Sequence, residues 1–328
     1  MIQRSFSLLV AGFVFGLELA LAPGVSAGQT TPATARVGFV APQGRSLPLF
    51  SAFQQGLAEL GYVEGKNIDI EARFAEGHYE QFPELFAELA NLKVDVIAVT
   101  GAITARAATQ AVSGIPIVFA VVVDPVADDL VSNTQRPGTN LTGTTSFDPQ
   151  QAKKQLELLR EVLPTIKRVA ILGDQGVSPA LINACKAQAT AMGLEVLPIR
   201  VSATNPHLED VFATLREKHS QALIVLEEPV VGVLAGDIAA LASKDRLPTL
   251  FAPSRAAAGG LLTYGTSQVQ SIRRMAAYVD KILKGARPGD LPVERVTAYE
   301  LVVNARTARE IDVIIPPSVL KRADRITE

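Results

Sequence analysis

Short apolar segments alternate with amphipathic ones along most of the chain, and this alternation limits the possible folds more than any other feature. Strands are expected where Val, Ile, Leu and Ala cluster, at residues 36–40, 67–74, 95–100, 116–123, 140–145, 168–172, 194–201, 222–226, 248–252 and 261–264. Helices are expected where apolar residues recur at helical spacing, at 49–60, 79–92, 103–112, 151–163, 178–192, 207–219, 232–243 and 269–283. Strands that are mostly apolar throughout and alternate with helices predict parallel sheets covered on both faces.

The alternation runs through two rounds, which predicts two lobes. The second round starts after the segment Ser146–Gln150, and the length of 328 residues also suits about two domains. The C-terminal part, with a strand expected at 295–303, is too short for its own core and should pack back onto the lobes. The predicted fold class is α/β, with two doubly wound Rossmann-like lobes whose parallel sheets are joined by a three-crossover hinge. The expected crossovers lie near Ser146, Gly265 and Val296, and the lobes comprise 36–145 plus 266–296 and 146–265 plus 297–328.

The first 27 residues have the layout of a secretory signal peptide. Arg4 forms a short positive region, a mostly apolar stretch follows, and small residues precede an expected cleavage after Ala27. The alternative is an uncleaved membrane anchor, in which Glu18 would be costly near the middle of the span. The sole Cys185 lies far downstream, which argues against a lipoprotein. We therefore expect a periplasmic protein, with residues 28–35 as a tether.

The charge balance and the Cys and His content exclude several classes of protein. Thirty-one Lys and Arg against 33 Asp and Glu give a net charge of −2, without the basic excess usual in nucleic-acid-binding proteins. One Cys excludes a disulfide framework and a Cys-based zinc site. The three histidines, His78, His207 and His219, form no pair with metal-ligand spacing, so no cofactor is expected.

Sequence signatures of the common enzyme classes are absent from the chain. It has no glycine-rich dinucleotide motif after the first strand, no phosphate-binding P-loop and no nucleophile elbow. Cys185 lies on an Ala-rich helix face and is expected as a small core residue. The chain is therefore predicted not to be an enzyme. The alternative is a cleft enzyme that uses Asp124 with Glu227 or Glu228 as an acid–base pair.

Ligands of open parallel sheets bind beyond the carboxyl ends of the strands, so the loops there supply the candidate ligand-binding residues. In the first lobe these candidates are Gln43, Thr100, Gly101, Thr104, Asp124 and Ser146. Backbone N–H groups after Gly101, with the hydroxyls of Thr100 and Thr104, suit a carboxylate, but an ordinary helix cap explains them equally. Asp124 suits a ligand amine or hydroxyl, and its alternative role is an Asx turn or helix cap.

In the second lobe the candidates are Asp174, Gln175 and Glu227. The neighbouring Ser178 is explained by helix capping alone. Glu227 and Glu228 are adjacent, and solvated loop charges are the alternative interpretation of this pair. Arg45 in the first lobe favours an anionic ligand or is another solvated charge.

Several longer stretches resemble the ABC transporter substrate-binding protein family, whose best-known members bind tryptophan or tyrosine. The stretches include RVGFVAP, PIVFAVVVDPVADDLV, RPGTNLTGTTSF, GGLLTYG and YVDKILKGARPGDLPVE, and together they span nearly the whole chain after residue 35. The resemblance implies a type I periplasmic binding protein fold that holds a ligand between two lobes. It assigns ligand contact to Asp124, in VVVDPV, and to Tyr264 and Gly265, in LLTYG. Tyr264 is expected to stack on an aromatic group or line the hinge, or else to pack at a crossover.

The resemblance thus predicts the periplasmic component of an ABC importer that binds an amino acid or an aromatic or other small carboxylate. Its expected partners are that ligand and an inner-membrane ABC permease, with no nucleic acid, and the protein is expected as a monomer. The alternative is a periplasmic sensor that presents its closed, liganded form to a signalling receptor.

Overall fold

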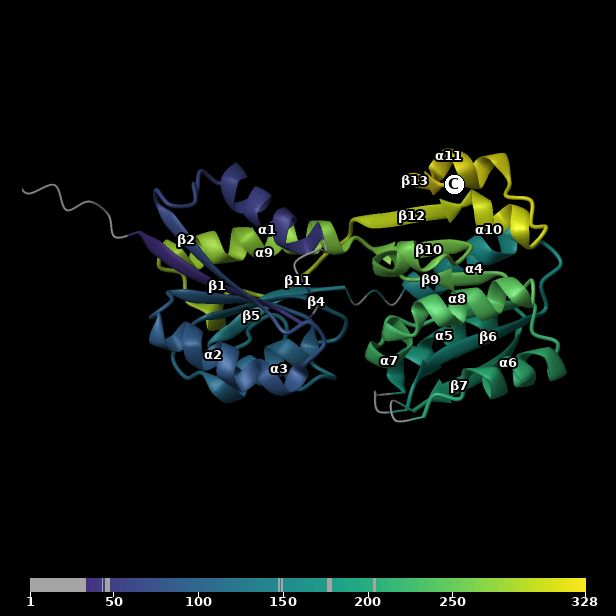
Figure 1. Cartoon of the computed structure of the whole chain (residues 1–328), viewed down its shortest axis with the longest axis horizontal. Coiled ribbons are helices and arrows are strands. Elements are labelled where there is room, and N and C mark those ends of the chain that lie inside the picture. The colour runs from purple at the N-terminus through teal and green to yellow at the C-terminus, as the bar shows by residue number, and fades with distance from the viewer. Residues whose placement is uncertain are drawn as a thin grey trace, which may run out of the picture. The chain divides into compact units, whose positions relative to one another are not determined.

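The computed structural model describes residues 34–328 except 43, 45–47, 147, 149, 176–178 and 203–204 (Figure 1). The predicted signal peptide and most of the tether lie outside the described residues. Among those described, no helix combines the length and apolar character needed to cross a bilayer.

The strands form two sheets. The first has six strands in the order β11-β5-β4-β3-β1-β2, and every neighbouring pair is parallel. Its strands are β1 (Ala35–Ala41), β2 (Ile68–Phe74), β3 (Val96–Thr100), β4 (Ile117–Val122), β5 (Leu141–Thr145) and β11 (Glu294–Arg295). The second sheet has seven strands in the order β13-β12-β10-β9-β8-β6-β7. They are β6 (Arg168–Asp174), β7 (Glu195–Val201), β8 (Ala222–Val225), β9 (Thr249–Phe251), β10 (Leu262–Thr266), β12 (Tyr299–Asn304) and β13 (Arg325–Thr327).

The chain changes sheet three times, because β6 to β10 follow β5, β11 returns to the first sheet, and β12 and β13 join the second. The C-terminal segment therefore completes the second sheet. The predicted lobe boundaries to the residue remain predictions.

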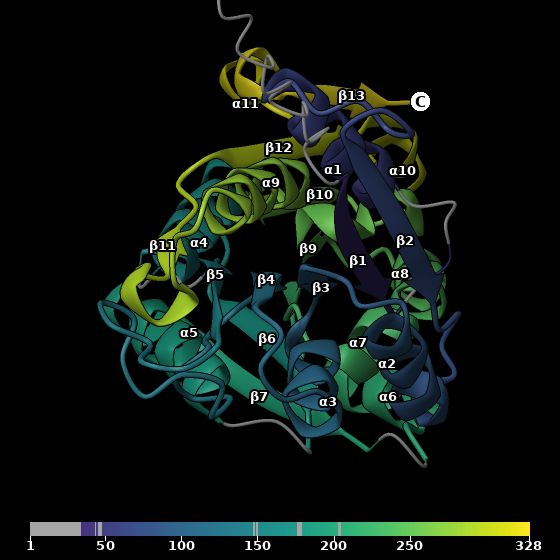
Figure 2. The ribbon, with the colours of Figure 1, turned by 90° about the vertical axis from the view of Figure 1, so that its left-hand side faces the viewer.

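Helices cover both faces of the first sheet (Figures 1 and 2). On one face lie α1 (Pro48–Glu59) and α9 (Gln268–Leu283), and on the other lie α2 (Phe82–Asn91) and α3 (Ala102–Ala111). Successive residues of a strand point to opposite faces, so Phe39 joins the core under α1 and α9 while Val40 joins the core under α2 and α3. This two-sided burial is why the strands are apolar at nearly every position.

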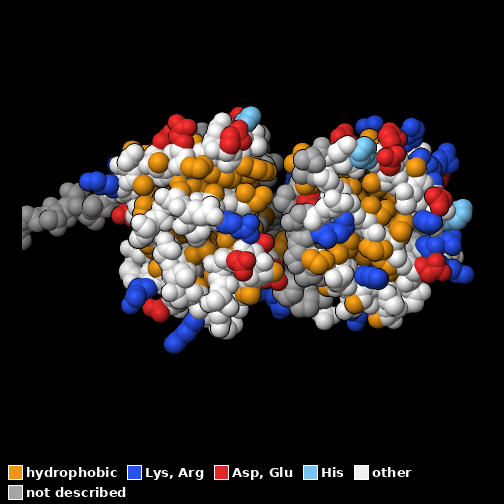
Figure 3. Space-filling view, turned by 90° about the horizontal axis from the view of Figure 1, so that it is seen from below, with side chains coloured by type: hydrophobic (Ala, Val, Ile, Leu, Met, Phe, Trp, Pro, Cys, Tyr) orange, Lys and Arg blue, Asp and Glu red, His pale blue; other side chains and the backbone are white. Residues whose placement is uncertain are grey.

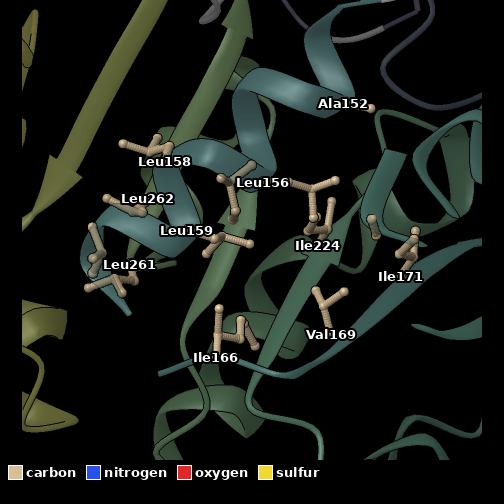
Figure 4. Close-up of a cluster of buried hydrophobic side chains, with 14 of the residues drawn as sticks. Ala152, Leu156, Leu158, Leu159, Ile166, Val169, Ile171, Ile224, Leu261 and Leu262 are labelled. Atoms are coloured by element: carbon tan, nitrogen blue, oxygen red, sulfur yellow. The ribbon is translucent and has the colours of Figure 1, made fainter. Parts of the chain in front are cut away.

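The second sheet is covered in the same way. Helices α4 (Gln151–Val162), α5 (Ala180–Ala191), α10 (Ala305–Glu310) and α11 (Pro317–Arg322) share one core, and α6 (Leu208–Glu217), α7 (Pro229–Val233) and α8 (Ala235–Lys244) share the other. Figure 4 shows the first of these cores, where Leu156 and Leu159 of α4 point toward the sheet residues Ile224 and Leu262. Cys185 is 1% exposed in this core, and burial raises the pKa of its thiol to about 12, as expected for a structural residue.

Four predicted elements differ in the structure. The helix expected at 232–243 is two helices, α7 and α8, since three Val residues and Gly232 give α7 a low helix propensity. The strand expected at 168–172 continues to Asp174, because it remains in register with β7. The helix expected at 79–92 opens with a 3-10 turn, Tyr79–Gln81.

The strand expected at 295–303 is also wrong, because it is split between the two sheets. The Val296 N–H donates to Thr145 of the first sheet, whereas the Ala298 carbonyl accepts from Ser267 next to the second. Strand β12 then pairs antiparallel with β10, so the second sheet is not wholly parallel.

Candidate ligand-binding site

The end of β3 and the start of α3 meet at the carboxyl edge of the first sheet. Gly101 caps α3 with φ of 83°, a left-handed value that favours glycine, and its N–H donates to the Ala120 carbonyl at 2.9 Å. Thr100 and Thr104 are 2% and 0% exposed, and neither hydroxyl has a hydrogen-bond partner among the described residues. The role of these hydroxyls as carboxylate ligands stays a prediction. The backbone N–H groups of the first turn of α3 are the donors that remain.

Asp124 and Ser146 lie at the same edge, after β4 and β5. One Asp124 carboxylate oxygen, Oδ1, accepts from the N–H groups of Val126 and Ala127, both at 3.1 Å, so the residue forms the turn that was its alternative role. The Ser146 N–H donates to the Val122 carbonyl at 2.9 Å and continues the pairing of β5 with β4. Both residues thus hold the edge together, and Oδ2 of Asp124 accepts no hydrogen bond from the residues that the structure describes.

Strand β4 contains a strained bulge just before Asp124. Val121 has φ of 59°, which is unusual for a β-branched residue, and the register with β5 shifts between Phe119 and Val122. A buried hydroxyl pair supports the bulge. Ser271 of α9 lies 2.8 Å from the Thr144 hydroxyl and accepts from the Val121 N–H at 3.3 Å. Such strain is commonly found at binding sites.

Asp174, at the carboxyl end of β6, is buried and fully used by the fold. Its two carboxylate oxygens accept from the N–H groups of Val230 and Val231 at 2.7 and 3.0 Å, which caps α7. Gln175 is exposed, and its N–H donates to the Val201 carbonyl at 2.9 Å. Helix capping thus engages both carboxylate oxygens of Asp174, and its role as a ligand contact stays a prediction.

Glu228 lies against Asp174 and is equally buried, at 6% exposure. Its carboxylate accepts a short hydrogen bond from the Asp174 N–H, and the guanidinium of Arg200 donates to the Asp174 carbonyl at 2.8 Å. Burial, together with the charge of Asp174, raises the pKa of Glu228 to about 7. The interpretation of Glu228 as a solvated loop charge is therefore wrong.

Glu227 is held by two other segments at the end of β8. Its Oε1 accepts from the hydroxyl of Ser254 at 3.1 Å and from the amide of Gln268, at the start of α9, at 2.8 Å. Burial raises the pKa of Glu227, and these two hydrogen bonds and the charge of Arg255 oppose that rise. Glu227 is therefore an anchored carboxylate whose second oxygen, Oε2, has no partner in the part of the chain that the structure describes.

Tyr264 and Gly265 lie in β10, beside the chain crossings. The Tyr264 ring stacks on Tyr299 with centroids 5.8 Å apart and an interplanar angle of 4°. The Tyr299 hydroxyl donates to the carboxylate of Asp148, which also accepts from Lys154 at 3.4 Å. Burial would raise the pKa of Asp148, but these partners and the Gln150 N–H lower it below its usual value. Tyr264 thus packs at a crossover, which was its alternative role.

Gly265 is buried, and a side chain there would lie 3.1 Å from Pro253 and 3.2 Å from Gln151. The close approach of these neighbours accounts for the glycine without a ligand.

Exposed apolar side chains occur on both edges. Ile103 and Val126, at the first edge, are 37% and 43% exposed, and Val233, at the end of α7, is 77% exposed. Single exposed apolar side chains are ordinary on protein surfaces, so these residues alone do not mark a binding site.

Gln43, Arg45 and Ser178 lie outside the described residues. The site also includes Asp148, Gln268 and Tyr299, which the sequence did not indicate as candidates. Ser254 lies in a loop that follows an expected strand, which made it a possible candidate, but no role was predicted for it.

Comparison with known proteins agrees with this architecture. Residues 43–327 match the family described as ABC transporter substrate binding protein. The chain belongs to this family. A crystal structure from Streptococcus pneumonia, described as an ABC domain in complex with L-Trp, is 25% identical, with a TM-score of 0.78 over 90% of this chain and 100% of that chain. A conserved domain protein from Vibrio cholerae is 28% identical, with the same TM-score and the same coverage of both chains. A tyrosine-binding protein from Clostridioides difficile is 23% identical over 79% of this chain and 75% of its own.

Membership of the ABC transporter substrate-binding family confirms the resemblance and the type I periplasmic binding protein-like fold predicted from the sequence. It also places the chain among substrate-binding proteins and not among enzymes. In the part of the chain that the structure describes, no group of His, Cys, Asp and Glu is arranged to hold a metal ion.

The face in Figure 3 carries basic and acidic side chains among apolar ones.

Proposed function

We propose that this substrate-binding protein captures a small polar ligand between its two lobes and delivers it to an ABC permease. The ligand is an amino acid, such as tryptophan or tyrosine, or another small carboxylate. The single observation that carries this proposal is family membership along residues 43–327, joined to the likeness to a relative solved with L-Trp. Hinge closure around a ligand is a common use of two lobes joined by several crossings.

The proposed site comprises the two carboxyl edges described above. Backbone N–H groups after Gly101 and the unused oxygen of Asp124 would supply polar contacts from the first edge, and Glu227 would supply one from the second. Ile103, Val126 and Val233 would contact the apolar part of the ligand. This combination of a few polar groups with apolar walls is typical of small-molecule sites.

The proposed location is the periplasm, reached through cleavage of a signal peptide after Ala27. The positive, apolar and small-residue regions of residues 1–27 support it. The proposed partners are the ligand and an inner-membrane permease, and the protein is proposed to act as a monomer. The lobes are proposed to meet near Ser146, Gly265 and Val296.

Fluorescence titration with L-tryptophan tests the function directly, because the chain contains no Trp and all indole emission comes from the ligand. A saturable change in emission is expected. Thermal unfolding with amino acids and aromatic carboxylates extends the test to other ligands. A ligand present at a hundredfold excess over its Kd should stabilise the protein by about 2.7 kcal/mol. If none of these compounds binds, the proposal is wrong.

A further inference from the structure

Arg255 lies at the carboxyl edge of the second sheet, in a 3-10 segment (Pro253–Ala258) between β9 and β10. Its guanidinium lies against the backbone of Gly232 in α7. A Cβ atom at residue 232 would be 2.5 Å from Nη2 and 3.1 Å from Cζ of Arg255. A side chain at residue 232 would therefore displace the guanidinium, which lies over this glycine at the edge of the sheet.

This guanidinium has no hydrogen-bond or ion-pair partner among the residues that the structure describes, although the side chain is half-buried. Arg200 at the same edge differs, because its guanidinium donates to the carbonyls of Asp174 and Gln175 at 2.8 and 3.0 Å. A guanidinium carries five N–H donors in a planar fork that matches a carboxylate. Arg255 therefore presents an unused carboxylate-binding group.

Glu227 supplies the opposite charge nearby. Its Oε1 is occupied by Ser254 and Gln268, while Oε2 has no partner among the described residues. Arg255 is close enough to influence the charge of Glu227, yet the two form no ion pair. The edge thus offers a cation and an anion that are close to each other but not paired.

We propose that Arg255 binds the carboxylate of the ligand and that Oε2 of Glu227 accepts from its ammonium group, so that this edge selects zwitterionic amino acids. This inference rests on the proposed function and narrows its ligand class. A bidentate carboxylate contact with Arg is one of the stronger polar contacts in proteins. Its loss should weaken binding about 10- to 100-fold.

Isothermal titration with three probes tests the assignment. The probes are L-tyrosine, tyramine, which lacks the carboxylate, and 3-(4-hydroxyphenyl)propanoate, which lacks the amine. Wild-type protein should bind L-tyrosine at least tenfold more tightly than either analogue. Arg255→Gln should weaken L-tyrosine binding about 10- to 100-fold and leave tyramine unchanged. Glu227→Gln should weaken L-tyrosine binding and leave the propanoate unchanged.

Gly232→Ala displaces the guanidinium without removing its charge and should also weaken L-tyrosine binding. Arg309→Gln, which removes an exposed charge on α10, should leave all affinities unchanged. Circular dichroism verifies that each variant is folded.

If wild-type protein binds none of the three probes or L-tryptophan, the proposed function and this inference both fail. If it binds tyramine as tightly as L-tyrosine, or if Arg255→Gln weakens both equally, only the assignment of Arg255 fails. If it binds the propanoate as tightly as L-tyrosine, the assignment of Glu227 fails.

Discussion

The carboxyl edges of the two sheets both bury polar side chains, but the buried groups differ in chemical type. At the first edge the buried polar groups include the hydroxyls of Thr100, Thr104 and Thr144, and the carboxylate that forms the turn after β4, Asp124, is partly open to solvent. At the second edge Asp174 and Glu228 are carboxylates, buried to 1% and 6% exposure. Burial costs far more for a charge than for a hydroxyl. The stability of the second edge therefore depends more on each hydrogen-bond partner of its buried carboxylates than the stability of the first edge depends on the partners of its hydroxyls.

The largest expected effect comes from removing the buried cap. Asp174→Ala leaves the N–H groups of Val230 and Val231 without an acceptor, and we expect a loss of about 2–5 kcal/mol in the free energy of unfolding, measured in urea. Asp124→Ala removes the matching turn at the first edge and should cost only about 1 kcal/mol, because water can replace that acceptor. Asp174→Asn keeps an acceptor and should lose less than the Ala variant. Equal losses for the two Ala variants would contradict the comparison.

The next effect is a pH dependence of stability that arises from Glu228 at the second edge. Burial raises the pKa of Glu228 from 4.5 to about 7, so the folded protein favours the protonated form. Its stabilising contribution is complete below pH 4.5 and is lost as the pH rises through 7, by about 3 kcal/mol at most. Glu228→Gln cannot ionise and should be more stable than wild type at pH 8.

Urea unfolding between pH 5 and pH 8 measures this difference. Glu195→Gln, at an exposed position of β7, should follow the wild-type curve. A Glu228→Gln variant that loses stability with pH as steeply as wild type would rule out Glu228 as the source.

At the first edge the hydroxyl pair Ser271 and Thr144 supports the bulge, and its removal should have a smaller effect on stability. Ser271→Ala leaves the buried Thr144 hydroxyl and the Val121 N–H without their partner, and we expect a loss of about 1–3 kcal/mol. Thr109→Ala removes an exposed hydroxyl from α3 and should change stability by less than about 0.5 kcal/mol. Urea unfolding measures both, and a Ser271→Ala variant as stable as wild type would show that the bulge does not need this support.

The smallest expected effect lies between the edges, at the chain crossings. Tyr299→Phe removes the hydroxyl that donates to Asp148 and should cost about 1 kcal/mol. Tyr62→Phe is a matched control, because Tyr62 donates to Asp280 at 3.0 Å away from the crossings. Both variants should lose similar stability in urea, but only Tyr299→Phe should change the radius of gyration in small-angle scattering. An identical change in both would argue against a role for Tyr299 in the hinge.

The alternation of strands and helices was predictable because strands buried on both faces are apolar at nearly every position. The cap at Asp174 was not, because Gly173-Asp174 looks like a turn while the partner that extends the strand, β7, is more than 20 residues away. The bulge at Val121 leaves no signal either, since IVFAVV is an unbroken strand pattern. Glu227 and Glu228 are the same residue type, and only their neighbours distinguish them. Glu227 accepts hydrogen bonds from two other segments, whereas Glu228 lies buried against Asp174.

The late return of the chain to the first sheet affects how the protein emerges during synthesis or export. Residues 35–145 supply five of the six strands of the first sheet, but α9, which covers one face with α1, ends at Leu283. Ile272 and Met275 of α9 share a core with Val118 and Ala120. Until α9 has emerged, that apolar face has no cover from it, and the whole second alternation is made in the interval. The first lobe therefore begins first but is completed only after most of the second lobe has been made, and β12 and β13 then complete the second sheet.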